Sequence, residues 1–128
     1  MARREADPSR LAAYRRGLSA ESLAAWSYRL RLCRVLARRY RTPVGEIDLI
    51  VRRGRTIIFV EVKRRGTELG AIEAVTARAR KRIARAAELW LAAHPQAAGF
   101  DLRFDIVLIS PGRLPRHISS AFDGEGRS

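Results

Sequence analysis

Two neighbouring segments of the chain carry acidic side chains and a lysine at alternating positions. Residues 45–51 read Gly-Glu-Ile-Asp-Leu-Ile-Val, and residues 56–63 read Thr-Ile-Ile-Phe-Val-Glu-Val-Lys. Both segments are typical of β-strands because apolar, β-branched residues dominate them. Strand alternation puts side chains of one parity on one face of a sheet. It therefore gathers the residues that could do chemistry: Glu46, Asp48, Glu61 and Lys63.

The turn between these segments sets which side chains meet. A hairpin closed around Arg53-Gly54 places Glu46 opposite Glu61 and Asp48 opposite Phe59. Three carboxylates then crowd one face of an otherwise apolar sheet. Like charges this close repel one another and raise each other's pKa unless a cation lies among them. The pattern therefore predicts a site for a divalent cation, Mg²⁺ or Mn²⁺.

The lysine in this motif is unusual for the chain. Of 26 basic residues, only Lys63 and Lys81 are lysine, and arginine follows Lys63 directly at positions 64 and 65. A lysine ammonium is a compact charge on a flexible stem, unlike the planar arginine fork. Chance usage is the alternative explanation, but we interpret Lys63 as required for orienting a water or contacting a phosphate.

Charge is distributed unevenly around the motif. The net charge is +13, and residues 1–45 hold eleven arginines against three acids, whereas 46–75 are nearly balanced. A basic frame around an acidic centre favours a protein that attracts a polyanion, most simply nucleic acid. A solvated arginine surface is the alternative.

Composition limits the remaining classes. A chain of 128 residues supports one domain, 1–128, in which we expect 1–8 and 113–128 to be flexible or loosely packed. No apolar run reaches the ~20 residues of a membrane span, and no signal peptide is evident, which favours a cytoplasmic protein without membrane contact. One cysteine and two histidines give no zinc-ligand spacing.

The predicted elements alternate between helix and strand. Ser19 predicts an N-cap for a helix over 20–30, strands follow over 33–40 and in the hairpin at 46–63, a helix covers 76–93, and 102–109 is the last strand. This order, α-β-β-β-α-β, predicts an α/β fold in which helices flank a mixed sheet of about four strands. We expect the last strand beside the first or second. Either Trp26 or Ser27 fits the apolar stripe of the first helix, and we expect Trp26 and Trp90 on inner helix faces as core residues, with base stacking as the alternative.

This order, with Asp48 and Glu61-Val62-Lys63, resembles the restriction-endonuclease-like superfamily, whose signature is an acidic residue followed by a Glu-x-Lys strand. More narrowly, the chain is similar to the YraN family of bacterial proteins, predicted endonucleases related to archaeal Holliday junction resolvases. The matching stretches span roughly residues 17–122 and include Gly45-Glu46-Ile47-Asp48 and Phe59-Val60-Glu61-Val62-Lys63.

The resemblance implies roles by position. Asp48 and Glu61 would be metal ligands and Lys63 the catalytic lysine, and a glutamate of the first helix falls on Glu21. The carbonyl of Val62 could add a ligand, and Glu46 is a further candidate. Arg39 departs from the pattern, because asparagine is common there in the family.

These features favour a metal-dependent endonuclease acting on DNA, with branched or structured DNA as a candidate substrate. A non-catalytic nucleic-acid-binding protein that retains the fold is the alternative. A homodimer would suit resolvase-like chemistry because two strands must be cut. We expect the following basic side chains to contact nucleic acid: Arg15, Arg16, Arg38, Arg41, Arg64, Arg65, Arg78, Lys81 and Arg82.

Overall fold

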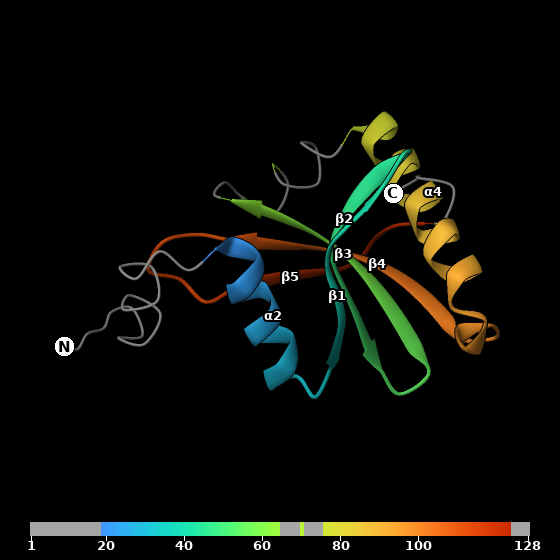
Figure 1. Cartoon of the computed structure of the whole chain (residues 1–128). Coiled ribbons are helices and arrows are strands. Elements are labelled where there is room, and N and C mark those ends of the chain that lie inside the picture. The colour runs from blue at the N-terminus through green and yellow to red at the C-terminus, as the bar shows by residue number, and fades with distance from the viewer. Residues whose placement is uncertain (1–18, 65–69, 71–75, 124–128) are drawn as a thin grey trace.

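The computed structural model describes residues 19–64, 70 and 76–123. Within these residues, two α-helices and a short 3₁₀ helix accompany a five-stranded sheet (Figure 1). In chain order the elements are α2 (Ala20–Leu30), β1 (Arg34–Thr42), β2 (Gly45–Arg53), β3 (Thr56–Arg64), α4 (Ala77–Ala93), η1 (Pro95–Ala97), β4 (Asp101–Ile109) and β5 (Arg116–Phe122). The predicted mixed α/β fold is confirmed.

Helix α2 has the limits that its capping residues predict. The hydroxyl of Ser19 accepts a hydrogen bond from the N–H of Ser22 at 3.1 Å. At the other end, the N–H groups of Leu32 and Cys33 donate to the carbonyls of Arg29 and Tyr28, both at 3.0 Å. These two hydrogen bonds form a Schellman motif, which requires a left-handed residue just after the helix. Leu32 takes that conformation, with φ 66°.

Helix α4 also begins and ends as predicted. Thr76 caps it by accepting from the N–H of Ala79 at 3.1 Å, and His94-Pro95 follows its last residue. Because Pro95 cannot donate a backbone hydrogen bond, the α-helix does not continue. Trp90 lies on the buried face, as predicted, together with Ile83, Ala84, Ala86 and Ala87.

The strands lie in the order β1-β2-β3-β4-β5, and only β3 and β4 are parallel. The prediction that the last strand of the motif lies beside the first or second was wrong, because β4 pairs with β3. A helical crossover joins parallel neighbours readily, and the hairpin leaves one edge of β3 open for that pairing. A fifth strand, Arg116–Phe122, then pairs with β4, where we had expected loose packing.

The hairpin register also differs from the prediction. Arg53 pairs with Thr56, and Ile50 pairs with Phe59, so the turn is Gly54-Arg55, one residue later than expected. Gly54 has φ 60°, a left-handed conformation that glycine adopts without strain. Moving the turn by one residue shifts every pairing by two, which brings Asp48 across from Glu61 instead of from Phe59.

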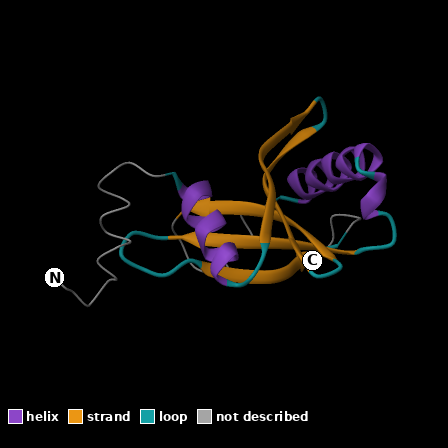
Figure 2. Cartoon of the chain, turned by 60° about the horizontal axis from the view of Figure 1, so that its bottom comes forward, coloured by secondary structure: helices purple, strands orange, loops and turns teal. Residues whose placement is uncertain are grey.

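The two helices cover opposite faces of the sheet (Figure 2). On the α4 face, Trp90 packs against Phe59 with ring centroids 5.9 Å apart. On the α2 face, Leu23 and Tyr28 pack against strand residues such as Val60. Trp26 does not join this core, because Ser27 takes the inward position and Trp26 is 39% exposed. The expectation that Trp26 lies on an inner face was therefore wrong.

Asp105 fastens α2 to the sheet. Its fully buried carboxylate accepts two hydrogen bonds from the guanidinium of Arg103, at 2.9 and 3.0 Å, and one from the hydroxyl of Tyr28 at 2.8 Å. The N–H of Ser120 on β5 donates a fourth at 3.0 Å. A buried carboxylate needs such partners, and here they link α2, β4 and β5.

Replacing the strained Leu32 tests the end of α2. Leu32→Gly should raise the free energy of unfolding by about 0.5–1 kcal/mol. Relief of a left-handed conformation is worth ~1–2 kcal/mol, and the greater freedom of glycine in the unfolded chain offsets part of it. Leu30→Gly is the matched control, an exposed leucine inside the helix, and should instead lower stability by about 1 kcal/mol. Urea unfolding midpoints measure both changes, and a loss of stability in Leu32→Gly would contradict the strain.

Candidate metal and nucleic-acid site

Asp48 and Glu61 meet across adjacent strands. The β2–β3 ladder ends at the pair Leu49–Val60, and Asp48 and Glu61 are the next residues of the two strands. Their carboxyl groups share a hydrogen bond, and the backbone N–H of Val62 donates to Asp48 Oδ2 at 2.8 Å. Both residues are partly buried. The sheet therefore holds two carboxyl groups in direct contact.

This contact perturbs the titration of both groups. Burial, the charge of Asp48 and the hydrogen bond with Asp48 together raise the pKa of Glu61 to about 8, although the nearby Lys63 acts to lower it. Burial also raises the pKa of Asp48, although the hydrogen bonds from Val62 and Glu61 oppose the shift. The pair therefore favours holding a proton between the carboxyl groups of Asp48 and Glu61. Two carboxylates that cannot both ionise are a common sign of a functional site.

Lys63 lies beside this pair, two residues beyond Glu61 on β3. Its Nζ is 3.4 Å from Glu61 Oε2, and the Lys63 side chain remains 31% exposed. The ammonium can therefore contact both the carboxyl pair and a molecule that approaches from solvent.

Glu21 approaches the pair from α2 but has its own partner. Arg39 Nη2 lies 3.4 Å from Glu21 Oε1, and Glu21 is close enough to Asp48 to raise the pKa of Asp48. Burial acts to raise the pKa of Glu21, but its backbone hydrogen bond and the charge of Arg39 lower it overall. Glu21 therefore stays ionised at the margin of the pair.

Arg39 is a site residue that the sequence interpretation did not select. It has φ 50° and faces the stretch of β2 that holds Asp48, between the pairs Arg38–Leu49 and Tyr40–Ile47. A left-handed residue is uncommon within a strand, and asparagine tolerates that conformation better than most residues. The asparagine common at this position in the YraN family was the signal that could have identified it.

Glu46 lies on the other side of the pair, nearer to α4. It pairs with Arg41 directly across β1 and β2, with Arg41 Nε 3.0 Å from Glu46 Oε2. Glu46 and Glu61 also line a cavity of about 260 Å³ whose opposite wall is the start of α4, with Arg78 and Arg82. The cavity thus joins the carboxyl pair to positive charge. The predicted pairing of Glu46 opposite Glu61 was wrong, because the register sets Asp48 there instead.

A divalent cation fits the chemistry of the carboxyl pair. Among the described residues, no three acidic, histidine or cysteine side chains lie together as a complete metal cage. Mg²⁺ does not need such a cage, since it commonly binds one or two carboxylates and keeps several waters for a phosphate to replace. A cation bound between Asp48 and Glu61 would take the place of the proton that the two carboxyl groups share.

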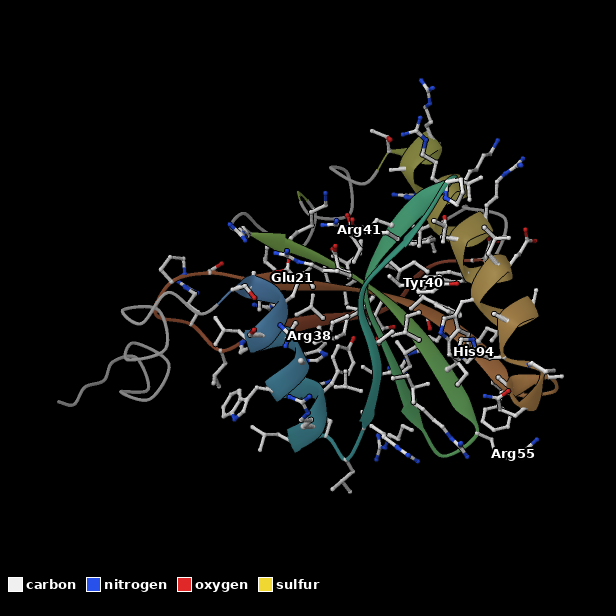
Figure 3. The ribbon with its side chains drawn as sticks, viewed as in Figure 1. Glu21, Arg38, Tyr40, Arg41, Arg55 and His94 are labelled. Atoms are coloured by element: carbon white, nitrogen blue, oxygen red, sulfur yellow. The ribbon has the colours of Figure 1, made fainter. Side chains whose placement is uncertain are left out.

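Basic side chains surround this region. The structure places the predicted contacts Arg38, Arg41, Arg64, Arg78, Lys81 and Arg82 at exposed positions. Arg38 extends from β1 to α2, where its Nη2 donates to Ser22 Oγ at 2.6 Å (Figure 3). Arg15, Arg16 and Arg65 lie outside the described residues, as do 1–8. Within the part that is described, no helix has the length and apolarity to cross a membrane.

Comparison with known proteins places the chain in a family. The profile of the uncharacterised protein family UPF0102 matches residues 20–109, which span α2 to β4. The chain belongs to this family, which is the YraN family that the motifs resemble.

The sequence similarity to relatives extends over nearly the whole chain. A UPF0102 protein of Methylorubrum extorquens is 56% identical over 94% of this chain and 96% of its own. One from Bradyrhizobium diazoefficiens is 55% identical over 92% of this chain and 89% of its own. A third, from Parvibaculum lavamentivorans, is 54% identical over 88% and 84%. The domain described here is therefore shared by these relatives almost end to end.

The raised pKa of Glu61 predicts how stability depends on pH. Since the folded pKa, about 8, lies above the unfolded value, the folded protein binds the extra proton between these values. That stabilisation is complete below the unfolded pKa and is lost as pH rises through 8. Metal-free protein in EDTA should therefore unfold at progressively lower urea concentration from pH 5 to 9. Glu61→Gln should remove much of this slope, and an unchanged slope in the variant would show that Glu61 does not carry the proton.

Proposed function

We propose that this protein is a metal-dependent nuclease that hydrolyses phosphodiester bonds in DNA. The observation that carries the proposal is the buried contact of Asp48 and Glu61, with Lys63 3.4 Å from Glu61. A sheet that served only to fold would gain nothing from two adjacent, partly buried carboxyl groups, because each loses hydration and each opposes the ionisation of the other.

Asp48 and Glu61 would hold Mg²⁺ or Mn²⁺, and the carbonyl of Val62 could complete the set from the same strand. Bound there, the cation would offset the negative charge that builds on the phosphate during hydrolysis. The hydrogen bond from the Val62 N–H fixes the orientation of Asp48 in advance. Glu21 and Glu46 would contribute through water or directly, once they leave their arginine partners.

Lys63 would act on the attacking water or on a phosphate oxygen. Its ammonium is small enough to lie beside Glu61 and still project toward solvent, where the phosphate would arrive. A guanidinium at the same place would be larger and planar, and it could not keep the same distance from both groups. Replacing Lys63 by arginine therefore keeps the positive charge but removes the geometry that catalysis would need.

Arginines on both sides of the site would bind the phosphate backbone. Arg78 and Arg82 share the 260 Å³ cavity with Glu61, and Arg38 and Arg41 lie on the strand that edges the sheet. Arginine forks suit phosphate oxygens and do not distinguish bases. We therefore expect weak sequence preference.

Conservative substitutions at the pair should separate cleavage from binding. Asp48→Asn and Lys63→Arg should each reduce Mg²⁺-dependent cleavage by at least about 100-fold, the typical effect of losing one group that stabilises a transition state. Affinity for DNA should stay equal or rise in Asp48→Asn, since a negative charge is lost. Cleavage assays on linear, single-stranded and four-way-junction DNA with Mg²⁺ or Mn²⁺ measure the rates, and gel shifts in EDTA measure affinity.

The chain offers matched controls for these changes. Lys81→Arg alters the only other lysine, which is exposed on α4, and Asp101→Asn alters an exposed acid at the start of β4. Both should keep the wild-type rate. Full activity in Lys63→Arg would contradict a catalytic lysine. Wild-type protein that cleaves none of the three DNA forms with either metal would leave only nucleic-acid binding.

Binding to DNA should weaken steeply with salt. With about six phosphate contacts, affinity should fall about 10³-fold between 50 and 200 mM salt. Replacing both Arg78 and Arg82 by Gln should lower the salt slope by about two. Arg113→Gln, an exposed arginine between β4 and β5, is the control and should leave the slope unchanged. Fluorescence anisotropy of a labelled duplex measures these slopes, and salt-independent binding would contradict the phosphate contacts.

A further inference from the structure

Large apolar side chains are exposed at the C-terminal end of α2. Trp26 is 39% exposed, Leu30 is 64% exposed and Leu32 is 81% exposed. Trp26 and Leu30 lie one helical turn apart, so they share a side of α2. We call these three residues the Trp26 patch. Its solvent-facing surface makes no contribution to the two cores.

The patch is maintained at a cost to stability. Leu32 occupies the left-handed position that ends the Schellman motif, where glycine is usual, and it exposes nearly its whole side chain. Trp26 likewise points to solvent although Leu23 and Tyr28 on the same helix are buried. Clustered apolar exposure of this kind marks a surface that meets another molecule.

Positive charge around the patch indicates what that molecule is. Arg29, Arg31 and Arg34 are exposed nearby in the chain. Arg38 donates to Ser22 at 2.6 Å, which sets its guanidinium one turn before Trp26 on α2. An aromatic ring among arginines suits a nucleic-acid strand, since a base can stack on the ring while the arginines bind phosphates. Arg34 and Arg38 lie on the edge strand β1, where their charges would repel the same strand of a second copy of the chain.

Helix α2 connects the patch to the carboxyl pair. Glu21, which acts electrostatically on Asp48, precedes Trp26 by five residues, or about 7.5 Å along the helix axis and about 140° around it. Ser22, which accepts from Arg38, lies one turn before Trp26 on the same side of α2. A strand whose phosphate lies at Asp48 and Glu61 would therefore pass Arg38 and Ser22 to reach Trp26, several nucleotides away.

We propose that Trp26 stacks on an unpaired base a few nucleotides from the cleaved phosphodiester, while Arg29 and Arg38 bind the adjoining phosphates. This inference rests on the proposed function and names its substrate class, a nucleic acid with a single-stranded segment beside the cut. A paired base inside a duplex has both faces covered by its neighbours, so only an unpaired base can stack on the ring.

The two tryptophans provide a direct test. Trp90 is 3% exposed and stacks on His94 with ring centroids 4.1 Å apart, so its fluorescence should not respond to a ligand at the surface. In EDTA, which prevents cleavage, a single-stranded DNA oligonucleotide should quench the tryptophan fluorescence of the wild type. The quenching should be absent in Trp26→Phe, whose remaining fluorescence comes from Trp90.

Affinity gives the second measurement. Trp26→Ala should weaken binding of the single-stranded oligonucleotide by between about 5- and 150-fold, the effect of losing one stacked base. Binding of a blunt duplex should change less than about twofold, because that binding relies on phosphates. Leu89→Ala is the control, an exposed apolar residue of α4 that is 43% accessible, and should alter neither. Because Trp26 is outside the core, thermal unfolding should show that the variants remain folded.

Several results would overturn the inference. These are no quenching by the oligonucleotide, an equal loss of single-strand and duplex affinity in Trp26→Ala, or a Trp26 response only to anionic phospholipid vesicles or to protein concentration. Metal-dependent cleavage by the wild type, with Trp26→Ala unaffected, would remove the stacking role and leave the proposed function. Quenching that depends on Trp26, without cleavage under any metal, would support the stacking and remove the nuclease.

Discussion

The hydrogen bond from the backbone N–H of Val62 to Asp48 is the contact on which the site depends. It joins a side chain of β2 to the main chain of β3, with 2.8 Å between the Val62 nitrogen and Asp48 Oδ2. This bond holds Asp48 beside Glu61. Without it, two acidic side chains on neighbouring strands would separate toward solvent, since each opposes the ionisation of the other. The contact requires the β2–β3 register, and the register in turn requires a two-residue turn at Gly54-Arg55.

The rest of the fold supports this contact from both sides. Asp105 draws together α2, β4 and β5, and so fixes the helix that brings Glu21 to the margin of the pair. On the other face, Gly45 allows α4 to approach closely, because a Cβ there would lie 3.0 Å from the carbonyl oxygen of Arg82. That approach forms the cavity where Arg82 faces Glu61. Both helices thereby present charge to the same end of the sheet, and this convergence is the physical basis of the proposed chemistry.

Local signals in the sequence were sufficient for most of the elements. Ser19 and Thr76 define the helix starts because their hydroxyls accept backbone hydrogen bonds, and Pro95 stops α4. Alternation correctly put Glu61 on the face of Ile57 and Phe59. Features that depend on long-range pairing were harder. The turn position was predicted one residue early, and β5 has a short polar sequence whose pairing with β4 is not evident locally.

Helix periodicity was ambiguous for Trp26, since both Trp26 and Ser27 fitted the stripe, and size favoured the wrong residue. The small Ser27 faces inward because it meets His117 Nε2 at 2.6 Å, a contact with β5 that no periodicity reveals. Arg39 was missed because arginine has no preference for the left-handed backbone that it adopts here, with φ 50°.

Proton release on metal binding tests the central claim most directly. Calorimetric titration of Mn²⁺ into EDTA-treated, dialysed protein at pH 7, repeated in buffers of different ionisation enthalpy, counts the protons that leave. With the pKa of Glu61 at about 8, each bound Mn²⁺ should displace close to one proton from the wild type and almost none from Glu61→Gln. Absence of Mn²⁺ binding, or binding without proton release, would contradict a metal site built on Asp48 and Glu61.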